Sequence, residues 1–585
     1  MPTTLATLRP MLSALALAAA SLVASAPAAA APGLPSTNVA WQPAAVAADI
    51  DRAFAQARAE KKPVLLYWGA TWCPPCNQLK ATLFNRQEFA ALSKNFVAVH
   101  VDGDRPGAQK LGARFKVSGY PTTVLFSPEG QEITRLPGEV DPPQALSILQ
   151  LGLTGGRAVK AVLADALAGK TLPAGDWRLL AFYGWETDEQ QVVPKSELPG
   201  LLTRLAALHA SAGTPANTPA NTPASTSVIT AADSETTNRL WLKALAASDD
   251  GQGVKPDAAL RERVQRLLAD PLQARLQMDV LTSGAADIVR TLEADGSPAR
   301  PTLVAAFEAA LKRFEADATL SRADRLGGIN ARVDLARLGT PKDTVQVSLP
   351  AALVAEVKAH VARDDREITD GYERQAVITS GAYTLGRAGL WAESDALLKA
   401  NLAKSHSAYY LMSQLGSNAR KQGRKDEALQ WYQQAFDKSE GPATRLQWGS
   451  GYLTALVDLA PQDTPRIQKL ASQLLNEAAK DTSAFEGRSA RSLQRAGAKL
   501  VSWSADGKRA PVLQKLQSQL DGVCAKVDTA DGQRAACQAV LKPAAKPAAK
   551  TAANTAANTA ANTAANIAAD TAAEIALNTA VTTAA

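Results

Sequence analysis

A buried-strand pattern followed closely by two cysteines constrains this chain more than any other feature. Residues 64–68 read "VLLYW", a continuous apolar run of the kind expected for a strand covered on both faces. Cys73 and Cys76 come shortly after it, with only Pro74 and Pro75 between them. This order places Cys73 at a helix N-terminus, where the helix dipole and free N–H groups favour a thiolate. Because a thiolate is the attacking species in disulfide exchange, the pattern favours a redox-active pair.

Two other uses of the cysteine pair are a zinc site and a purely structural disulfide. A structural zinc site needs four ligands, usually in two close pairs, and the chain has no second CxxC motif. Its four histidines are scattered, so no metal site is expected. A structural disulfide is less favoured than a redox pair, because a CxxC loop directly after a buried strand activates its first cysteine.

The residues around the pair alternate between helix and strand patterns. Apolar residues recur at helical spacing over residues 46–57, and a second continuous apolar run at residues 96–101 predicts another strand. Two further strands flank the turn "SPEG" and predict a hairpin. The hairpin strands are expected at residues 122–126 and 132–136, and further helices at residues 75–83, 108–115 and 142–153. The order predicts a small α/β domain with a mixed sheet.

Strand patterns almost vanish after residue 153, and the chain reads as helical. Residues 388–405 resemble residues 422–439 at an offset of 34 residues, which is the period of tetratricopeptide (TPR) repeats. Small and large residues alternate there in the manner that lets paired helices approach and then fills the gap between them. We therefore predict a TPR-like stack, with an ordinary helical bundle as the alternative. The concave face of such a stack usually binds a peptide or protein.

The ends and the linker are recognised by composition. An apolar run after Arg9, followed by Ala-x-Ala sites, predicts a signal peptide, with a membrane anchor as the less favoured alternative. The predicted divisions are a signal peptide (1–30), the small α/β domain (40–153), a helical segment (154–212), a Pro/Thr/Asn/Ala linker (213–229), an all-α TPR-like region (230–541) and a low-complexity tail (542–585). The tail has too few large apolar groups to form a core.

The motif "YWGATWCPPC", followed by "GYPTTVLF", resembles the thioredoxin superfamily over residues 46–150. The resemblance implies a thioredoxin-like fold in which Cys73 is the exposed nucleophile and Cys76 the resolving thiol. It also implies a cis peptide bond before Pro121, in a loop that packs beside the cysteines. Trp72, Tyr120 and Pro121 would then contact the bound substrate. The stretch "FSPEGQEITRLPG" is similar to thioredoxin-like domains of periplasmic electron-transfer proteins.

The chain departs from the family at the site of proton transfer. Many thioredoxins keep a buried carboxylate six residues before the first cysteine, paired with a lysine on the next central strand. Tyr67 and Ala98 occupy these positions here. Lys80, Glu129 or a water molecule would then have to accept the proton of the Cys76 thiol.

Cys524 and Cys537 follow a different pattern from the CxxC pair. They lie on two predicted helices that flank the turn "DTADG". A disulfide between them would staple this hairpin, and closing a loop of this size stabilises a fold by about 3 kcal/mol in the chain-entropy model. The alternatives are a second redox pair and an internal substrate for Cys73.

These patterns predict a periplasmic thiol–disulfide oxidoreductase that reduces or exchanges disulfides in client proteins. The expected partners are those clients and an electron-donor protein, with no cofactor and no membrane span in the mature chain. The net charge of +7 is spread along the sequence without a Lys/Arg cluster among aromatics, so nucleic acid is not an expected partner. The alternative is a scaffold protein whose thioredoxin fold is a binding module with little turnover.

Overall fold

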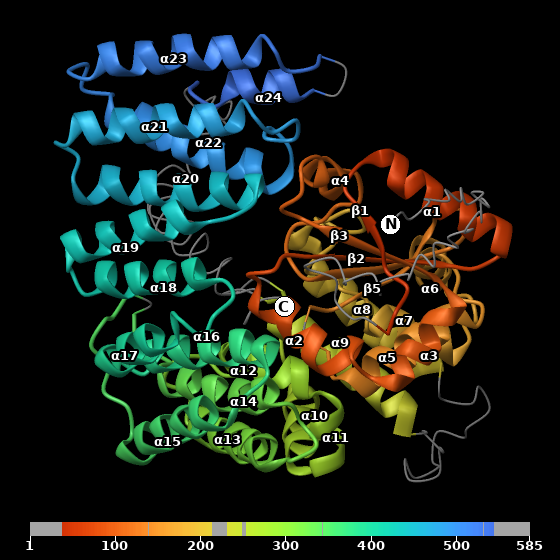
Figure 1. Cartoon of the computed structure of the whole chain (residues 1–585). Helices are drawn as coiled ribbons and strands as arrows, with labels where there is room; N and C mark the ends of the chain where they lie inside the picture. Colours follow the sequence, from red (N-terminus) through yellow and green to blue (C-terminus); the bar gives the residue numbers. More distant parts are fainter. Residues whose placement is uncertain are drawn as a thin grey trace, which may run out of the picture.

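The computed structural model describes residues 38–138, 140–212, 231–248, 253–341, 343–529 and 532–542. The predicted signal peptide, the predicted linker and, apart from Lys542, the predicted tail lie outside these residues. The described chain consists of a mixed α/β sheet domain followed by a long all-helical region, which confirms the predicted fold class (Figure 1).

The sheet has five strands in the order β1-β3-β2-β4-β5. Strands β1 and β2 each pair with β3 in parallel, whereas β4 is antiparallel to both β2 and β5. Their bounds are Gln42–Ala44, Val64–Gly69, Val97–Asp102, Thr122–Phe126 and Glu132–Leu136. The four predicted strands are confirmed within a residue or two. The short β1, whose three residues gave no apolar run, was not foreseen.

Helices α1 to α8 surround the sheet. Their bounds are Ala47–Glu60, Pro74–Leu79, Gln87–Leu92, Ala108–Arg114, Pro142–Leu153, Val159–Leu167, Ala174–Ala181 and Leu198–Ala212. A π-helical turn over Lys80–Phe84 continues α2, and short 3₁₀ turns over Ser93–Asn95 and Lys195–Glu197 precede β3 and α8. Proline occupies the first turns of both α2 and α5, where its missing N–H costs no helical hydrogen bond.

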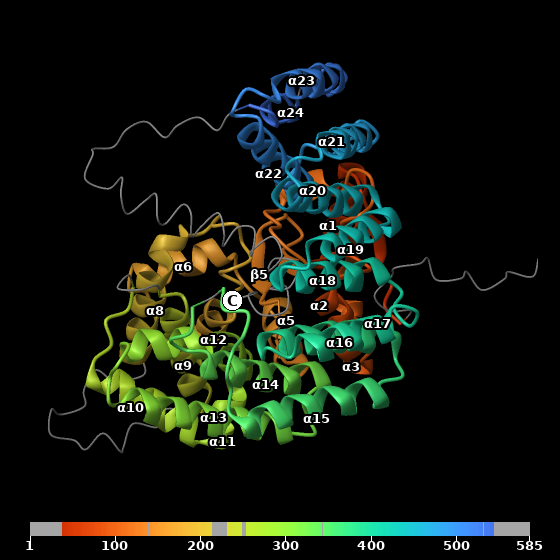
Figure 2. The same ribbon diagram turned by 90° about the vertical axis from the view of Figure 1, so that its left-hand side faces the viewer.

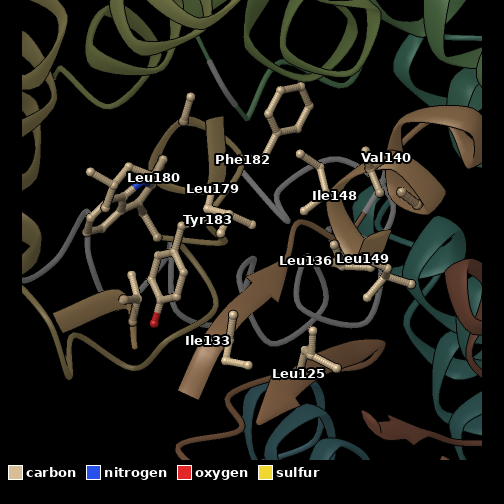
Figure 3. Packing of buried hydrophobic residues seen from close by; sticks show 14 of the residues in the cluster. Leu125, Ile133, Leu136, Val140, Ile148, Leu149, Leu179, Leu180, Phe182 and Tyr183 are labelled. Carbon is tan, nitrogen blue, oxygen red and sulfur yellow. Dashed lines mark hydrogen bonds between the residues drawn. The ribbon is translucent and has the colours of Figure 1, made fainter. Parts of the chain in front are cut away.

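One face of the sheet shares a core with the helices that follow it. Leu125 and Ile133 point toward Ile148 and Leu149 of α5 and toward Leu179 and other residues at the end of α7 (Figure 3). The chain after α7 also bonds to the sheet edge. The backbone N–H of Gly184 donates to the carbonyl of Arg135 at 2.8 Å, and the Tyr183 hydroxyl donates to Glu132 at 2.9 Å. Residues 154–212 therefore complete the sheet domain in space.

The all-helical region runs from α9 to α24. Its bounds are Ala231–Ala246, Ala258–Ala269, Pro271–Leu276, Met278–Leu292, Arg300–Ala316, Arg322–Ala336, Ala351–Glu367, Gly371–Arg387, Trp391–Asn401, Ala408–Lys421, Lys425–Lys438, Pro442–Leu459, Thr464–Ala478, Gly487–Trp503, Ala510–Cys524 and Gln533–Ala539. Figures 1 and 2 show these helices stacked beside the sheet domain, with α23 and α24 at one end of the stack.

Each copy of the repeat seen in the sequence contains one helix of the stack. Helix α17 begins at Trp391 and α19 at Lys425, which is 34 residues later. A Cβ atom on Gly416 of α18 would lie 2.9 Å from the ring of Tyr432 of α19, so glycine permits this close helix approach. The small-against-large pairing expected from the sequence is therefore present between α18 and α19.

A fragment that ends at residue 155 should be much less stable than one that ends at residue 212, when both begin at residue 31. Removing α6 to α8 uncovers several large apolar side chains, each worth about 2 kcal/mol of burial. We expect the shorter fragment to unfold at least about 10 °C below the longer one in thermal circular dichroism. Equal unfolding temperatures would show that residue 153 is a true domain end.

Candidate active site

Cys73 caps the N-terminus of α2, as the sequence predicts. Its sulfur accepts a hydrogen bond from the backbone N–H of Cys76 at 3.2 Å. Pro74 and Pro75, the first two residues of the helix, carry no N–H, so Cys76 is the sole backbone donor among the three residues after Cys73. The two cysteines form a disulfide with a Cα–Cα distance of 5.2 Å.

The Pro121 loop lies next to the cysteines. The Tyr120–Pro121 peptide bond is cis, as the resemblance implied. Thr122, the next residue, pairs with Trp68 at the end of β2, from which the chain leads into the CxxC motif. A hydrogen bond joins this loop to α4, since the Gln109 side-chain amide donates to the Tyr120 hydroxyl at 2.9 Å.

The Trp72 side chain is surrounded by residues of the all-helical region. Its ring stacks on Tyr410 of α18, with centroids 5.9 Å apart, and meets Trp448 of α20 edge-on at 4.8 Å. Its indole N–H lies 2.8 Å from the Thr444 hydroxyl of α20 and 2.9 Å from Asp104. Thr444 in turn donates to the same Asp104 carboxylate. The guanidinium of Arg488 of α22 lies over the Trp72 ring at 5.7 Å.

The expectation that Cys73 is exposed is wrong for this structure. Cys73 and Cys76 are 0% exposed and Trp72 is 2% exposed, because helices of the all-helical region cover them. The cavity beside Pro74 and Pro75 has a volume of only about 30 Å³. It has room for water but not for a peptide strand.

Neither member of the family's buried carboxylate–lysine pair is present, because Tyr67 and Ala98 occupy the two positions. Tyr67 is fully buried and lies opposite His100 on β3, with ring centroids 5.2 Å apart. Ala98 is also buried but pairs with Leu65 instead. Burial lowers the pKa of His100 to about 3, so this imidazole is neutral. Neither position supplies a carboxylate for proton transfer.

Of the two side chains proposed as proton acceptors, only Lys80 lies near the pair. It follows Cys76 by one helical turn and is 2% exposed. Burial lowers its pKa to about 8, although the Asp102 carboxylate acts in the opposite direction. Glu129 is exposed in the β4–β5 turn, at the opposite end of β4 from Pro121, and cannot serve this role.

Asp104 is a buried carboxyl group between the sheet domain and the helices. It follows β3, whose carboxyl end lies beside that of β2. Burial and, to a smaller extent, the charge of the neighbouring Asp102 raise the pKa of Asp104 to about 7. The hydrogen bonds from Thr444 and Trp72 act in the opposite direction, as does the charge of Arg488. The group therefore changes charge near neutral pH while it accepts a hydrogen bond from Trp72.

Replacing Asp104 with Asn should weaken the pH dependence of stability. The folded-state pKa near 7 lies above the unfolded value near 3.8. The stabilising proton is therefore bound in the folded protein at pH 5 and is lost as the pH rises through 7. Between pH 5 and pH 8 the wild-type melting temperature should fall by about 2 °C or more beyond the fall seen in Asp104→Asn. An identical fall in both proteins would contradict this assignment.

Cys524 and Cys537 form the disulfide expected between the last two helices. Their Cα atoms are 5.6 Å apart, and both side chains are buried in the core of the helical stack. Helices α23 and α24 lie far from α2 in both views (Figures 1 and 2). This separation argues against their being an internal substrate for Cys73, and a structural staple stays our prediction.

Among the described residues, no group of three or more His, Cys, Asp or Glu side chains could hold a metal ion. None of the helices described combines the length and the apolar character that crossing a membrane requires.

Comparison with known proteins supports the fold and the motif. Residues 50–152 match the family described as a thioredoxin-like domain. The thiol:disulfide interchange protein DsbD 1 of Pseudomonas aeruginosa is 33% identical over 113 residues, which are 19% of this chain and 19% of that protein. A thioredoxin-like protein of Synechocystis is 32% identical over 90 residues, which are 15% of this chain and 81% of that protein. The solution structure of a thioredoxin from Thermus thermophilus is 27% identical, covers 19% of this chain and 85% of that chain, and gives a TM-score of 0.17.

The chain belongs to the thioredoxin superfamily through its sheet domain. It spans about a fifth of the length of the DsbD relatives that it matches. The match does not include the helices from α9 onward.

Sequence reasoning missed the residues that surround Trp72 from the helical region. The helical pattern predicted that this region binds a peptide or protein, but not that it binds the Trp72 side chain of the same chain. The residues that were missed are Thr444, Trp448 and Arg488. Asp104 could have been found, because it follows one of two predicted strands whose carboxyl ends meet at one edge of a parallel pair. The other strand leads to Cys73, so the two residues had to lie close together.

Proposed function

We propose that this chain is an exported, periplasmic thiol–disulfide oxidoreductase that reduces or exchanges disulfides in client proteins. The observation that carries the proposal is the Cys73–Cys76 pair at the start of α2, beside the cis-Pro121 loop. Relatives named as thiol:disulfide interchange proteins match this part of the chain and support the same activity.

The reaction needs only the dithiol and the client disulfide. The Cys73 thiolate attacks one sulfur of the client, which forms a mixed disulfide and releases the first client thiolate. Cys76 then loses its proton and attacks the Cys73 sulfur, which releases the second client thiolate and leaves the Cys73–Cys76 disulfide. The two client thiolates take up two protons. Two electrons from a dithiol protein must later reduce the pair, and Lys80 is our candidate for the base that receives the Cys76 proton.

The all-helical region is, in this proposal, a TPR-like stack that binds protein. The paired helices at a 34-residue interval support this assignment. The apolar run and Ala-x-Ala sites near the N-terminus support export to the periplasm, where disulfides persist. Trp72, Tyr120 and Pro121 surround the pair and are proposed to contact the client.

A second candidate function is a scaffold protein whose thioredoxin fold turns over little. The complete burial of Cys73 favours this alternative, because a covered thiol cannot reach a client disulfide. The intact CxxC pair and the cis-Pro121 loop favour the oxidoreductase.

Insulin reduction with dithiothreitol as the electron donor separates the two functions. We expect the wild type to accelerate insulin precipitation and Cys73→Ser to abolish the acceleration, because no mixed disulfide can form. Cys76→Ala should instead accumulate mixed disulfides that gel electrophoresis resolves without reductant. The proposal is wrong if neither the wild type nor a variant in which Cys73 is readily alkylated reduces insulin faster than Cys73→Ser does.

The reduction potential of the pair should lie on the reducing side. Pro74 and Pro75 remove two of the N–H groups that would stabilise a thiolate, so the reduced form is weakly stabilised. We expect a potential nearer about −270 mV than −120 mV, the values for thioredoxin and for a strong oxidant. Equilibration with glutathione, followed by alkylation and peptide mass analysis, measures it. A value above about −180 mV would instead point to a disulfide donor.

A further inference from the structure

The surface that the thioredoxin fold would present to a client is occupied by this chain itself. We define the redox face as Trp72, Cys73, Cys76, Tyr120 and Pro121. One apolar cluster contains Trp72, both cysteines and Tyr120 together with Tyr410, Trp448 and other residues of the helical region. The redox face is therefore part of a core shared by the sheet domain and the helices.

Four alternate helices of the stack make the contact, and we call α16, α18, α20 and α22 the cover. The Gln375 amide of α16 donates to the backbone carbonyl of Trp72 at 3.3 Å. Helix α18 supplies the Tyr410 ring, and α20 supplies Thr444 and Trp448. Helices α17, α19 and α21 alternate with the four cover helices along the chain. Among the described residues they give no hydrogen bond or ring contact to the redox face.

The contact continues past the redox face onto α4 and the loops beside it. At α22 the backbone N–H of Arg488 donates to the Gln109 side chain at 2.9 Å. Gly441 approaches so closely that an added Cβ would lie 2.6 Å from the Cβ of Asp104. Gly487 likewise would place a Cβ 3.0 Å from the carbonyl of Gln109. Glycine at both positions permits the cover to close fully on the sheet domain.

We propose that the cover is an intramolecular inhibitor that keeps the redox pair latent, and that Cys73 reacts with a client only after the cover moves off the redox face. This inference rests on the proposed oxidoreductase function. The cover holds the same side chain, Trp72, and the same cis-Pro121 loop that are proposed to meet a client. A client must therefore displace the cover rather than bind beside it.

The closed state is held by specific contacts that can be removed singly. Thr444→Val keeps the shape of the side chain but deletes its hydrogen bonds with Trp72 and Asp104. Tyr410→Leu deletes the ring that stacks on Trp72. A matched control is Thr379→Val with Tyr452→Leu. Thr379 donates only within its own helix, to the carbonyls of Gln375 and Ala376, and Tyr452 contacts Gln433 and Arg466 inside the stack.

The test compares the full-length wild type, the Thr444→Val/Tyr410→Leu double variant and the control double variant. Each protein is reduced and then exposed to iodoacetamide, and peptide mass analysis follows alkylation of Cys73 with time. Alkylation of the buried Cys524 and Cys537 reports on general loosening of the stack. A lost hydrogen bond and a lost aromatic pair should together make Cys73 at least about tenfold more reactive than in the wild type. The control should match the wild type.

The outcomes separate this inference from the function on which it rests. Faster alkylation of Cys73 and faster insulin reduction, confined to the first variant, support the cover. Faster alkylation without any insulin turnover also supports the cover, but it shows that the proposed function is wrong. Equal alkylation of Cys73 in all three proteins overturns the inference, as does equal acceleration in the control. If the double variant does not fold, Thr444→Val alone is compared with Thr379→Val.

Discussion

The packing of Trp72 between the sheet domain and the helical stack is the contact on which the rest of this structure depends. The resemblance to thioredoxins implied that this indole ring lies beside an exposed cysteine. Here it has ring neighbours on two helices and shares its N–H between Thr444 and Asp104. Burying so large a ring removes substantial apolar area from water. It also fixes the position of the adjacent Cys73. The exposure of Cys73 therefore depends on whether the helical stack is packed against the sheet domain.

This coupling gives one explanation for two features that otherwise disagree. The CxxC pair, the helix N-terminus and the cis-Pro121 loop are all arranged for disulfide exchange. The complete burial of Cys73 prevents that exchange in the closed form. A cover that can leave the redox face reconciles the two features. The helical stack was expected to bind another protein. In this structure, helices α16, α18, α20 and α22 instead contact the sheet domain of the same chain.

Some of the polar groups at this interface are charged, which bears on how it opens. Asp104 is buried beside Asp102 and faces Arg488 across the interface. Buried charged groups that have imperfect partners cost free energy, so they make a closed interface less stable than an apolar contact of equal area would. The interface therefore combines a large aromatic contact, which holds it closed, with a carboxyl pair that weakens it near neutral pH.

The sheet domain could be predicted closely because its signals are local. Continuous apolar runs predicted β2 and β3, and the "SPEG" turn predicted the hairpin of β4 and β5. The CxxC spacing and the "GYPT" loop predicted the site residues. The segment of α6 to α8 was predicted to be helical, but its packing on the sheet was not predicted. The apolar residues of α7 do not indicate in the sequence which residues they will contact. The cover was invisible for the same reason. Thr444 and Trp72 are 372 residues apart, and nothing local in either stretch indicates the other.

Hydroxyl-radical footprinting of the tryptophans in the full-length protein tests the central claim most directly. Trp68 lies in the sheet core and is 0% exposed, whereas Trp431 on the outer helix α19 is only partly buried. If the helical stack covers the redox face in solution, oxidation of Trp72 should be as slow as that of Trp68 and clearly slower than that of Trp431. Oxidation of Trp72 as fast as that of Trp431 would contradict the account.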